Sequence, residues 1–248
     1  MTEQEALQRL KADLLVRGLA ASTAKNYSRG VRDFFRFCNR PIENLDVLDV
    51  RRFLEHLIFE KRLAPRTVNS NSAAIRFFFA VTLNRTMNYL QIPLMKVPKS
   101  LPDLLSRKEV STLIGACTNV KHRALLLLAY GSGLRSSAIV TLRVRDIDSK
   151  EMRIFVKHGK SNRDHYTVLS QTTLEALRDY WRVFRPNSPE GWLFPGTKNV
   201  GHLTRAGVAF VFNVALGKTN IQKEVSTHSL RHVNRFFHCR KRCSGIQI

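Results

Sequence analysis

Apolar side chains in the first ninety residues recur at i, i+3, i+4 and i+7, the spacing of an amphipathic helix. The pattern predicts a helix over residues 3–17 and a second one that is capped by Ser22 and ends near Cys38. A third helix is predicted after Asp46, and Pro65 opens a fourth at a first-turn position. The side chains predicted to face inward are Ala6, Leu7, Leu10, Leu14, Tyr27, Val31, Phe34, Phe35, Cys38, Val50, Phe53, Leu54, Leu57, Ile58, Val68, Ile75, Phe78 and Phe79. No strand pattern interrupts these helices, so residues 1–90 are predicted to form a compact module of four or five helices.

Residues 91–105 have the composition of a connector. Their three prolines favour an extended chain over a helix, because proline lacks the N–H that a helix needs. Lys96 and Lys99 place positive charge on this segment. The connector can follow a phosphate backbone, or it can be a plain tether between two domains.

The second module, residues 106–248, opens with a capping box from Ser106 to Glu109. A strongly apolar helix is predicted over residues 121–130 and is expected to break at residues 131–133, which read Gly-Ser-Gly. The period then changes from helical to alternating, and two short β-rich runs flank a polar turn, which predicts a hairpin. These runs are residues 153–157 and 165–169, and further helices are predicted over 172–184 and around 203–216. The predicted fold class is mainly α (α+β), with a small antiparallel sheet in the second module.

Charge narrows the class of function. The 248 residues hold 41 Lys and Arg against 19 Asp and Glu, a formal net charge of +22. Both halves are basic, because residues 1–100 carry 17 basic and 9 acidic side chains, 17 − 9 = +8, and the remainder carries 24 − 10 = +14. A chain with this balance is predicted to bind nucleic acid, although solvated lysine-rich helix faces give a similar composition.

The sequence also lacks the patterns of a membrane span, a signal peptide and a zinc site. No apolar run approaches the roughly 20 residues that a membrane span needs, so no membrane partner is expected. The polar, acidic start is unlike a signal peptide, and four scattered cysteines suit a reducing cytosol, so a cytoplasmic, nucleoid-associated protein is predicted. His238, Cys239 and Cys243 lack the paired spacing of a zinc site, so we expect no metal and no other cofactor.

Three places carry candidate chemistry. Arg135 follows the Gly-Ser-Gly turn, where the backbone can approach a phosphate and a guanidinium can grip its oxygens. Lys160 lies in the predicted hairpin turn, where it can reach a phosphate or be a solvated surface lysine. His228 and Arg231 are spaced i, i+3 and share a helical face. The further cations predicted to contact DNA are Lys25, Arg29, Arg66, Lys96, Lys99 and Arg163.

Taken together and in this order, these stretches resemble the tyrosine recombinase (phage integrase) family. The matching motifs are Ala-Tyr-Gly-Ser-Gly-Leu-Arg at 129–135, Gly-Lys-Ser-Asn-Arg-Asp at 159–164 and His-Ser-Leu-Arg-His at 228–232. The helices of residues 1–90 are similar to that family's N-terminal core-binding domain, and residues 106–248 to its catalytic domain. The resemblance covers the chain up to about residue 232.

The resemblance implies a reaction. In this family a tyrosine attacks a DNA phosphodiester, forming a 3′-phosphotyrosine and a free 5′-hydroxyl, without a metal or nucleotide. By resemblance, Arg135 and Arg231 offset the charge on the phosphorus, and His228 assists proton removal from the nucleophile. Lys160 is the implied general acid for the leaving 5′ oxygen. The implied partner is double-stranded DNA at recombination sites, bound as a homo- or hetero-oligomer with another recombinase.

The chain departs from the family pattern in two places. Ala138 stands three positions after Arg135, where the family has an acidic residue, and no tyrosine follows Arg231. The last residues hold four Lys or Arg, two cysteines and no acid, so we expect an incomplete, C-terminally truncated member that is inactive alone. Three functions stay open: cleavage with a tyrosine supplied by a neighbouring subunit, occupation of recombination sites without chemistry, and general nucleic-acid binding.

Overall fold

The computed structural model describes residues 1–248 except 87–91, 93, 99–102, 158–162, 187 and 244–248, and leaves the side chains of 199 and 236–243 undescribed. The chain divides into two compact units, Met1–Ser100 and Leu101–Ile248. Each unit has its own buried apolar core.

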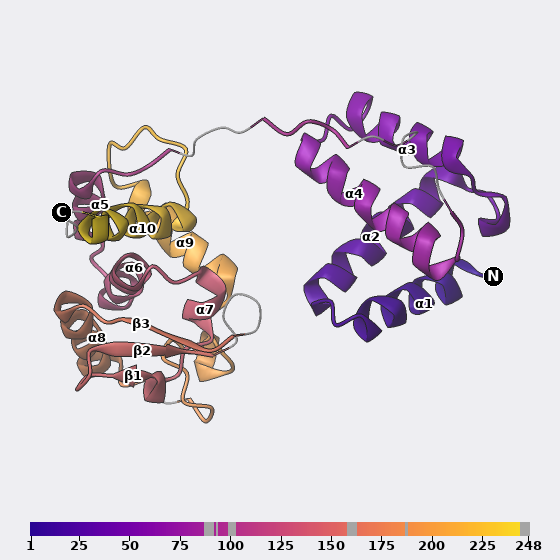
Figure 1. Ribbon diagram of the computed structural model, residues 1–248. Coiled ribbons are helices and arrows are strands. Elements are labelled where there is room, and N and C mark those ends of the chain that lie inside the picture. The colour runs from indigo at the N-terminus through magenta and orange to yellow at the C-terminus, as the bar shows by residue number, and fades with distance from the viewer. Residues whose placement is uncertain (87–91, 93, 99–102, 158–162, 187, 244–248) are drawn as a thin grey trace. The chain divides into compact units, whose positions relative to one another are not determined.

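The N-terminal unit is built from helices (Figure 1). They are α1 (Glu3–Val16), α2 (Ala21–Cys38), α3 (Val47–Phe59) and α4 (Pro65–Phe77), the last continuing as a π-helical turn over Phe78–Thr82. Helix α2 packs against α1, α3 and α4. Aromatic rings fill the centre, where the Phe34 ring meets those of Phe53 and Phe79 at centroid distances of 5.5 and 6.2 Å. The predicted apolar stripes therefore form one core.

Local signals explain most of these helix starts. Asp46 accepts hydrogen bonds from the backbone N–H groups of Leu48 and Asp49, which satisfies two donors that a helix start leaves free. Pro65 opens α4 as predicted. The prediction that Ser22 caps α2 is wrong, because the helix begins at Ala21 and its N-cap is Ala20, which forms no side-chain hydrogen bond.

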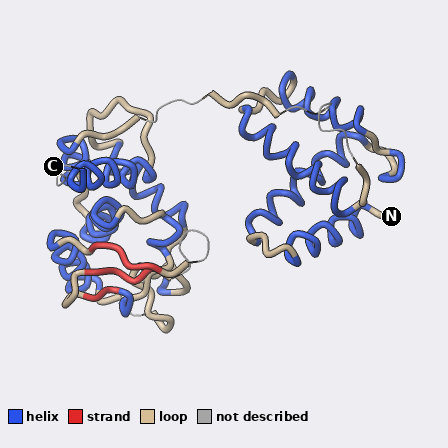
Figure 2. Tube along the Cα trace, viewed as in Figure 1, coloured by secondary structure: helices blue, strands red, loops and turns tan. Residues whose placement is uncertain are grey.

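The C-terminal unit combines helices with a small sheet (Figures 1 and 2). Strands β1 (Ile147–Asp148), β2 (Arg153–Val156) and β3 (His165–Val168) form an antiparallel sheet in the order β1-β2-β3. In its register Ile154 pairs with Ile147 on one side and with Thr167 on the other. The helices are α5 (Arg107–Gly115), α6 (Val120–Ser132), α7 (Ser136–Val140), α8 (Gln171–Phe184), α9 (Arg205–Leu216) and α10 (Thr227–Cys243).

The predicted fold class is confirmed, with local corrections. Helix α6 runs through Gly131 and Ser132 and ends at Gly133, whose φ of +61° is left-handed. The two-residue strand β1 was not predicted, and α9 begins at Arg205 rather than Leu203. Helix α6 packs against α8 and α10, so the apolar helix predicted from its sequence becomes the centre of the unit. Of the helices described, none is both long and apolar enough to cross a membrane.

Candidate active site

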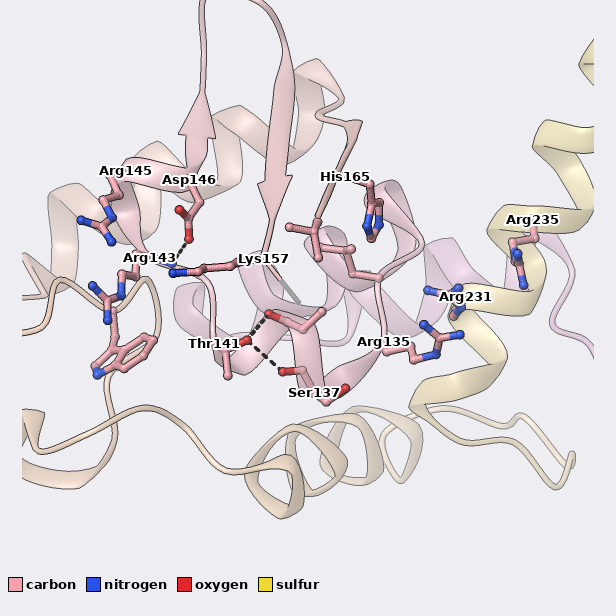
Figure 3. A pocket seen from close by; sticks show the side chains of 14 residues that line it. Arg135, Ser137, Thr141, Arg143, Arg145, Asp146, Lys157, His165, Arg231 and Arg235 are labelled. Carbon is pink, nitrogen blue, oxygen red and sulfur yellow. Dashed lines mark hydrogen bonds between the residues drawn. The ribbon is translucent and has the colours of Figure 1, made fainter. Parts of the chain in front are cut away.

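A basic cavity of about 870 Å³ opens in the C-terminal unit (Figure 3). Its lining holds six side chains that are cationic at neutral pH and one carboxylate, that of Asp146. The cations come from α7 and its approach, from the segment before β1, from the end of β2 and from α10. They are Arg135, Arg143, Arg145, Lys157, Arg231 and Arg235. A cavity with this excess of positive charge attracts an anion.

Helix α10 is held against the end of α6 by two side chains. The Arg231 guanidinium donates from Nη1 to the backbone oxygen of Gly133 at 2.5 Å, and Asn234 donates from Nδ2 to the oxygen of Gly131 at 3.1 Å. These bonds satisfy carbonyls that the end of α6 leaves without helical partners. The packing is close, because a Cβ on Gly133 would lie 2.5 Å from Oδ1 of Asn234. Arg231 therefore has a structural as well as an electrostatic role.

The starts of α7 and α10 lie next to each other. Arg135 occupies the N-cap position of α7, and the hydroxyls of Ser136 and Thr227 are 3.4 Å apart. Ser226 accepts a hydrogen bond from the backbone N–H of His228, which fixes the first turn of α10. This arrangement brings Arg135 into the same cavity as Arg231, although 96 residues separate them in sequence (231 − 135).

Burial and neighbouring positive charges lower the pKa values of two side chains at the start of α10, Arg231 and His228. Burial, and then the positive charges of Arg135 and Arg235, lower the pKa of Arg231. Burial followed by the charges of His232 and Arg231 also lowers the pKa of His228 below its usual range, with smaller contributions from Arg135 and Arg235. A neutral imidazole is favoured there at pH 7, and a neutral imidazole can accept a proton.

The other end of the cavity was not anticipated from the sequence. The Arg143 guanidinium lies 4.8 Å from the centre of the Trp192 ring, a cation–π contact. Asp146 accepts a hydrogen bond from the backbone N–H of Arg143 at 2.7 Å. Lys157 follows the last residue of β2, and His165 begins β3, so both described flanks of the β2–β3 connection line the cavity.

These residues escaped sequence reasoning because each lies in or next to a very short element. Their directions depend on tertiary packing, and no periodicity in the sequence carries that information. The alternation of β2, with Ile154 and Val156 buried, was the one usable signal, since it places Lys157 at a strand end near the predicted hairpin turn.

The structure brings together part of the predicted site. Arg135 and Arg231 line one cavity, while His228 is exposed on the first turn of α10, close enough to feel both charges but outside the lining. Arg163 is exposed and is not among the lining residues. Lys160 and Lys99 lie outside the described residues. Ala138 lines the cavity, so the position where the family has an acid contributes no charge here.

The remaining predicted DNA contacts lie in the N-terminal unit and the connector. Arg29 on α2 and Arg66 on α4 line one hollow of about 220 Å³, whose other lining residues are polar: Asn26, Thr67, Ser70 and Asn71. Lys25 is exposed one turn before Arg29, and Lys96 is exposed in the connector. The two arginines therefore meet across packed helices, which their sequence separation did not indicate.

A polar clasp holds the loop that leads into α10. Lys223 donates from Nζ to Oε2 of Glu109 at 2.8 Å and to the backbone oxygen of Leu104 at 3.1 Å. The ammonium of Lys223, and then the N-cap N–H and hydroxyl of Ser106, lower the pKa of Glu109 to about 2. The clasp joins the start of α5 to the approach of α10, which carries His228 and Arg231.

Within the part of the chain that the structure describes, no three side chains of His, Cys, Asp or Glu are placed to hold an ion together.

Comparison with known proteins gives a consistent family. Residues 103–234 match the phage integrase family, and residues 6–89 match the N-terminal SAM-like domain of phage integrases. An integrase/recombinase of Sinorhizobium fredii is 40% identical over 226 residues, which cover 91% of this chain and 72% of the relative. Tyrosine recombinase XerD of Rickettsia bellii is 28% identical over 251 residues, covering 91% and 82%.

Solved structures agree in fold. A lambda integrase tetramer bound to a Holliday junction matches with a TM-score of 0.75 at 16% identity, covering 96% of this chain and 73% of that one. A lambda integrase bound to DNA matches with the same TM-score at 17% identity, covering 97% and 88%. At these identities the likeness shows the fold alone.

Proposed function

We propose, since the chain belongs to the phage integrase family, that it binds duplex DNA at recombination sites and contributes to DNA strand cleavage and rejoining. The observation that carries this proposal is the meeting of Arg135 and Arg231 in a cavity with six cations and one carboxylate. Two guanidiniums aimed into one basic cavity suit the binding of a phosphodiester, whose oxygens accept paired hydrogen bonds.

The proposed chemistry is phosphoryl transfer to a tyrosine. The tyrosine oxygen attacks phosphorus and forms a 3′-phosphotyrosine, while the bond to the 5′ oxygen breaks and that oxygen takes up a proton. Arg135 and Arg231 stabilise the extra negative charge of the pentacoordinate phosphorus. The neutral imidazole of His228 accepts the proton of the nucleophile, and Lys160 supplies a proton to the leaving oxygen. We propose no metal and no other cofactor.

The source of the nucleophile is part of the proposal. Of the four tyrosines that the structure describes, none lines the cavity. Tyr180 is buried, which raises its pKa to about 12, and the ring of Tyr166 lies against the Arg153 guanidinium. We therefore propose that cleavage by this 248-residue chain uses a tyrosine of a second recombinase subunit, in a homo- or hetero-oligomer on DNA.

The N-terminal unit has a different proposed role. Residues 1–90 act as a core-binding domain in which Lys25, Arg29 and Arg66 contact phosphates, and Lys96 extends this contact along the connector. Residues 106–248 act as the catalytic-type domain. Since DNA is the proposed partner of both, a cytoplasmic, nucleoid-associated location follows.

The test uses a DNA duplex enriched from a random pool by the full chain and then nicked beside each candidate cleavage position. The chain alone is expected to form no covalent adduct on a denaturing gel. Mixing it with a family member that keeps its tyrosine but lacks an active-site arginine is expected to give an adduct on that partner. An adduct on one of this chain's own tyrosines contradicts the need for a second subunit.

A second function, occupation of recombination sites without chemistry, is favoured by one observation: Ala138 leaves the cavity without the acid that the family has there. The same gel separates the two functions. If the mixture gives no adduct while the chain still binds the enriched duplex, site occupation is supported and cleavage is contradicted.

A further inference from the structure

The cations of the cavity lie in two groups. Figure 3 draws one group, Arg135, Arg231 and Arg235, at one end of the cavity, and a second group at the other, made of Arg143, Arg145 and Lys157. The proposed chemistry uses only the first group, so the second needs its own explanation.

Arg143 is held in place before any ligand arrives. Its guanidinium lies on the Trp192 ring, and that ring is itself fixed by an edge contact with His202 at a centroid distance of 5.1 Å. The backbone around Arg143 is fixed as well, by the hydrogen bond from its N–H to Asp146. A side chain that is already ordered loses little entropy on binding, which favours a specific ligand contact over a mobile surface charge.

Arg145 and Lys157 are exposed, and Asp146 is the one carboxylate that lines the cavity at their end. Two other exposed cations of this unit pair with acids, Arg153 with Asp148 at 3.0 Å and Arg182 with Asp179 at 2.7 Å. Within the described residues neither Arg145 nor Lys157 has an ion-pair partner. Like charges gathered around one cavity repel each other, and an anion bound among them relieves that repulsion.

The cavity is large enough for more than one phosphate group. Its volume of about 870 Å³ is in the range of roughly 300–1,000 Å³ that drug-sized ligands fill. Consecutive phosphates of one DNA strand are the anion that such an elongated, two-ended cavity fits, because DNA repeats its charge along the strand. A single inorganic anion engages one end only.

We propose that Arg143, Arg145 and Lys157 form a second phosphate-binding subsite, which holds a neighbouring phosphate of the strand that is cut. This inference rests on the proposed function, because it takes the first group to hold the reacting phosphate. The second subsite sets the direction in which the strand crosses the cavity, since two anchored phosphates define a line and one does not. Arg143, Arg145 and Lys157 are thus positioning residues for the reaction.

The experiment compares two double variants of the full chain in a Trp181→Phe background, which leaves Trp192 as the single tryptophan. Arg145→Gln with Lys157→Gln alters the subsite. Lys150→Gln with Arg178→Gln is the matched control, because both are exposed cations of the same unit outside the cavity lining. For each protein, duplex affinity is measured over a series of salt concentrations, and Trp192 emission is followed during the titration.

The subsite variant is expected to bind duplex with a log K against log salt slope about 0.9 shallower than that of the parent, because it neutralises one phosphate fewer. The control is expected to keep the slope of the parent. Duplex is expected to change Trp192 emission in the parent and the control, and to change it less in the subsite variant, where the neighbouring phosphate is no longer held against Arg143.

Two results overturn different claims. If the subsite variant keeps the parent's steep slope and its emission change, the second subsite is wrong while DNA binding stands. If the parent itself shows no salt-dependent binding, the proposed function fails. The single variants Arg145→Gln and Lys157→Gln are measured as well. If neither of them shows a shallower slope, the subsite is contradicted, even where the double variant unfolds.

Discussion

The two units carry similar cations in different surroundings. In the N-terminal unit Arg29 and Arg66 are exposed on α2 and α4, beside a polar hollow of about 220 Å³. In the C-terminal unit Arg135 and Arg231 are partly buried in a larger cavity, and Arg231 is bonded to the backbone of α6. Exposed cations are well hydrated and screened, whereas partly buried ones act on a ligand through a lower effective dielectric.

This difference in surroundings corresponds to a difference in the proposed roles of the two units. We propose that the N-terminal unit supplies attraction for any phosphate backbone, and that the C-terminal unit holds the reacting phosphate among groups with a defined geometry. Changes at the Gly133–Arg231 contact should therefore affect structure and DNA binding together, whereas changes at Arg135, or on α2 and α4, should affect DNA binding alone.

Gly133→Ala is expected to be the most damaging single change. A left-handed backbone costs a non-glycine residue about 1–3 kcal/mol, and here the new Cβ also meets Asn234 at 2.5 Å. Gly191→Ala is the matched control, since Gly191 has a φ of +68° with nothing within 4 Å of the added Cβ. Urea unfolding should show a larger loss of stability for Gly133→Ala. Equal losses would show that α10 does not depend on this close approach.

The two cavity arginines are expected to differ in their effect on stability. Arg231→Ala leaves the carbonyl of Gly133 without this donor and should lower the free energy of unfolding by about 1–2 kcal/mol. Arg135→Ala should change it by less than about 0.5 kcal/mol, because no described group depends on its side chain for a hydrogen bond. Chemical denaturation measures both. A larger loss of stability for Arg135→Ala would reverse the assignment of the structural arginine.

The sequence predicts the helical core of the N-terminal unit better than it predicts the lining of the cavity. The core of the N-terminal unit follows from helical periodicity, since residues such as Phe34 and Ile75 are buried where the pattern places them. Arg135 and Arg231 were identified because they belong to motifs of a known family. Arg143, Arg145 and Lys157 lie on a 3₁₀ turn and at a strand end, where tertiary packing sets the direction of a side chain. Ala20 as the cap of α2 was missed for a related reason, because packing can place a helix start where no side chain caps it.

Neutralising the N-terminal cations is expected to weaken DNA binding without affecting stability. Arg29→Gln with Arg66→Gln should make the salt slope of duplex binding shallower by about 0.9 for each phosphate that these arginines neutralise, and leave the melting temperature unchanged. Arg9→Gln with Lys11→Gln, exposed cations of α1, is the matched control and should keep the parent slope. A control whose slope falls as far as that of the test variant would mean that the attraction is spread over the whole unit.

The smallest expected effect is on the pH dependence of stability. The pKa of His228 is lowered by burial and by His232, Arg231, Arg135 and Arg235, and that of His122 by burial, Lys121 and Lys218. With folded pKa values below those of the unfolded chain, the unfolded state binds more protons, so stability is lost as the pH falls from about 7.5 to about 5.5. Thermal melts should show this loss, and His228→Gln or His122→Gln should each reduce it. A steeper profile in either variant would contradict the sign.

One measurement tests most directly whether this cavity holds a DNA phosphate. It compares the salt dependence of duplex binding by Arg135→Gln with that of the unchanged chain. Arg135 lines the cavity, so neutralising it removes one phosphate-binding cation and little else. We predict that the slope of log K against log salt is shallower by about 0.9 in Arg135→Gln, and that its melting temperature is unchanged. If Arg135→Gln kept the slope of the unchanged chain, the claim that this cavity holds a DNA phosphate would be contradicted.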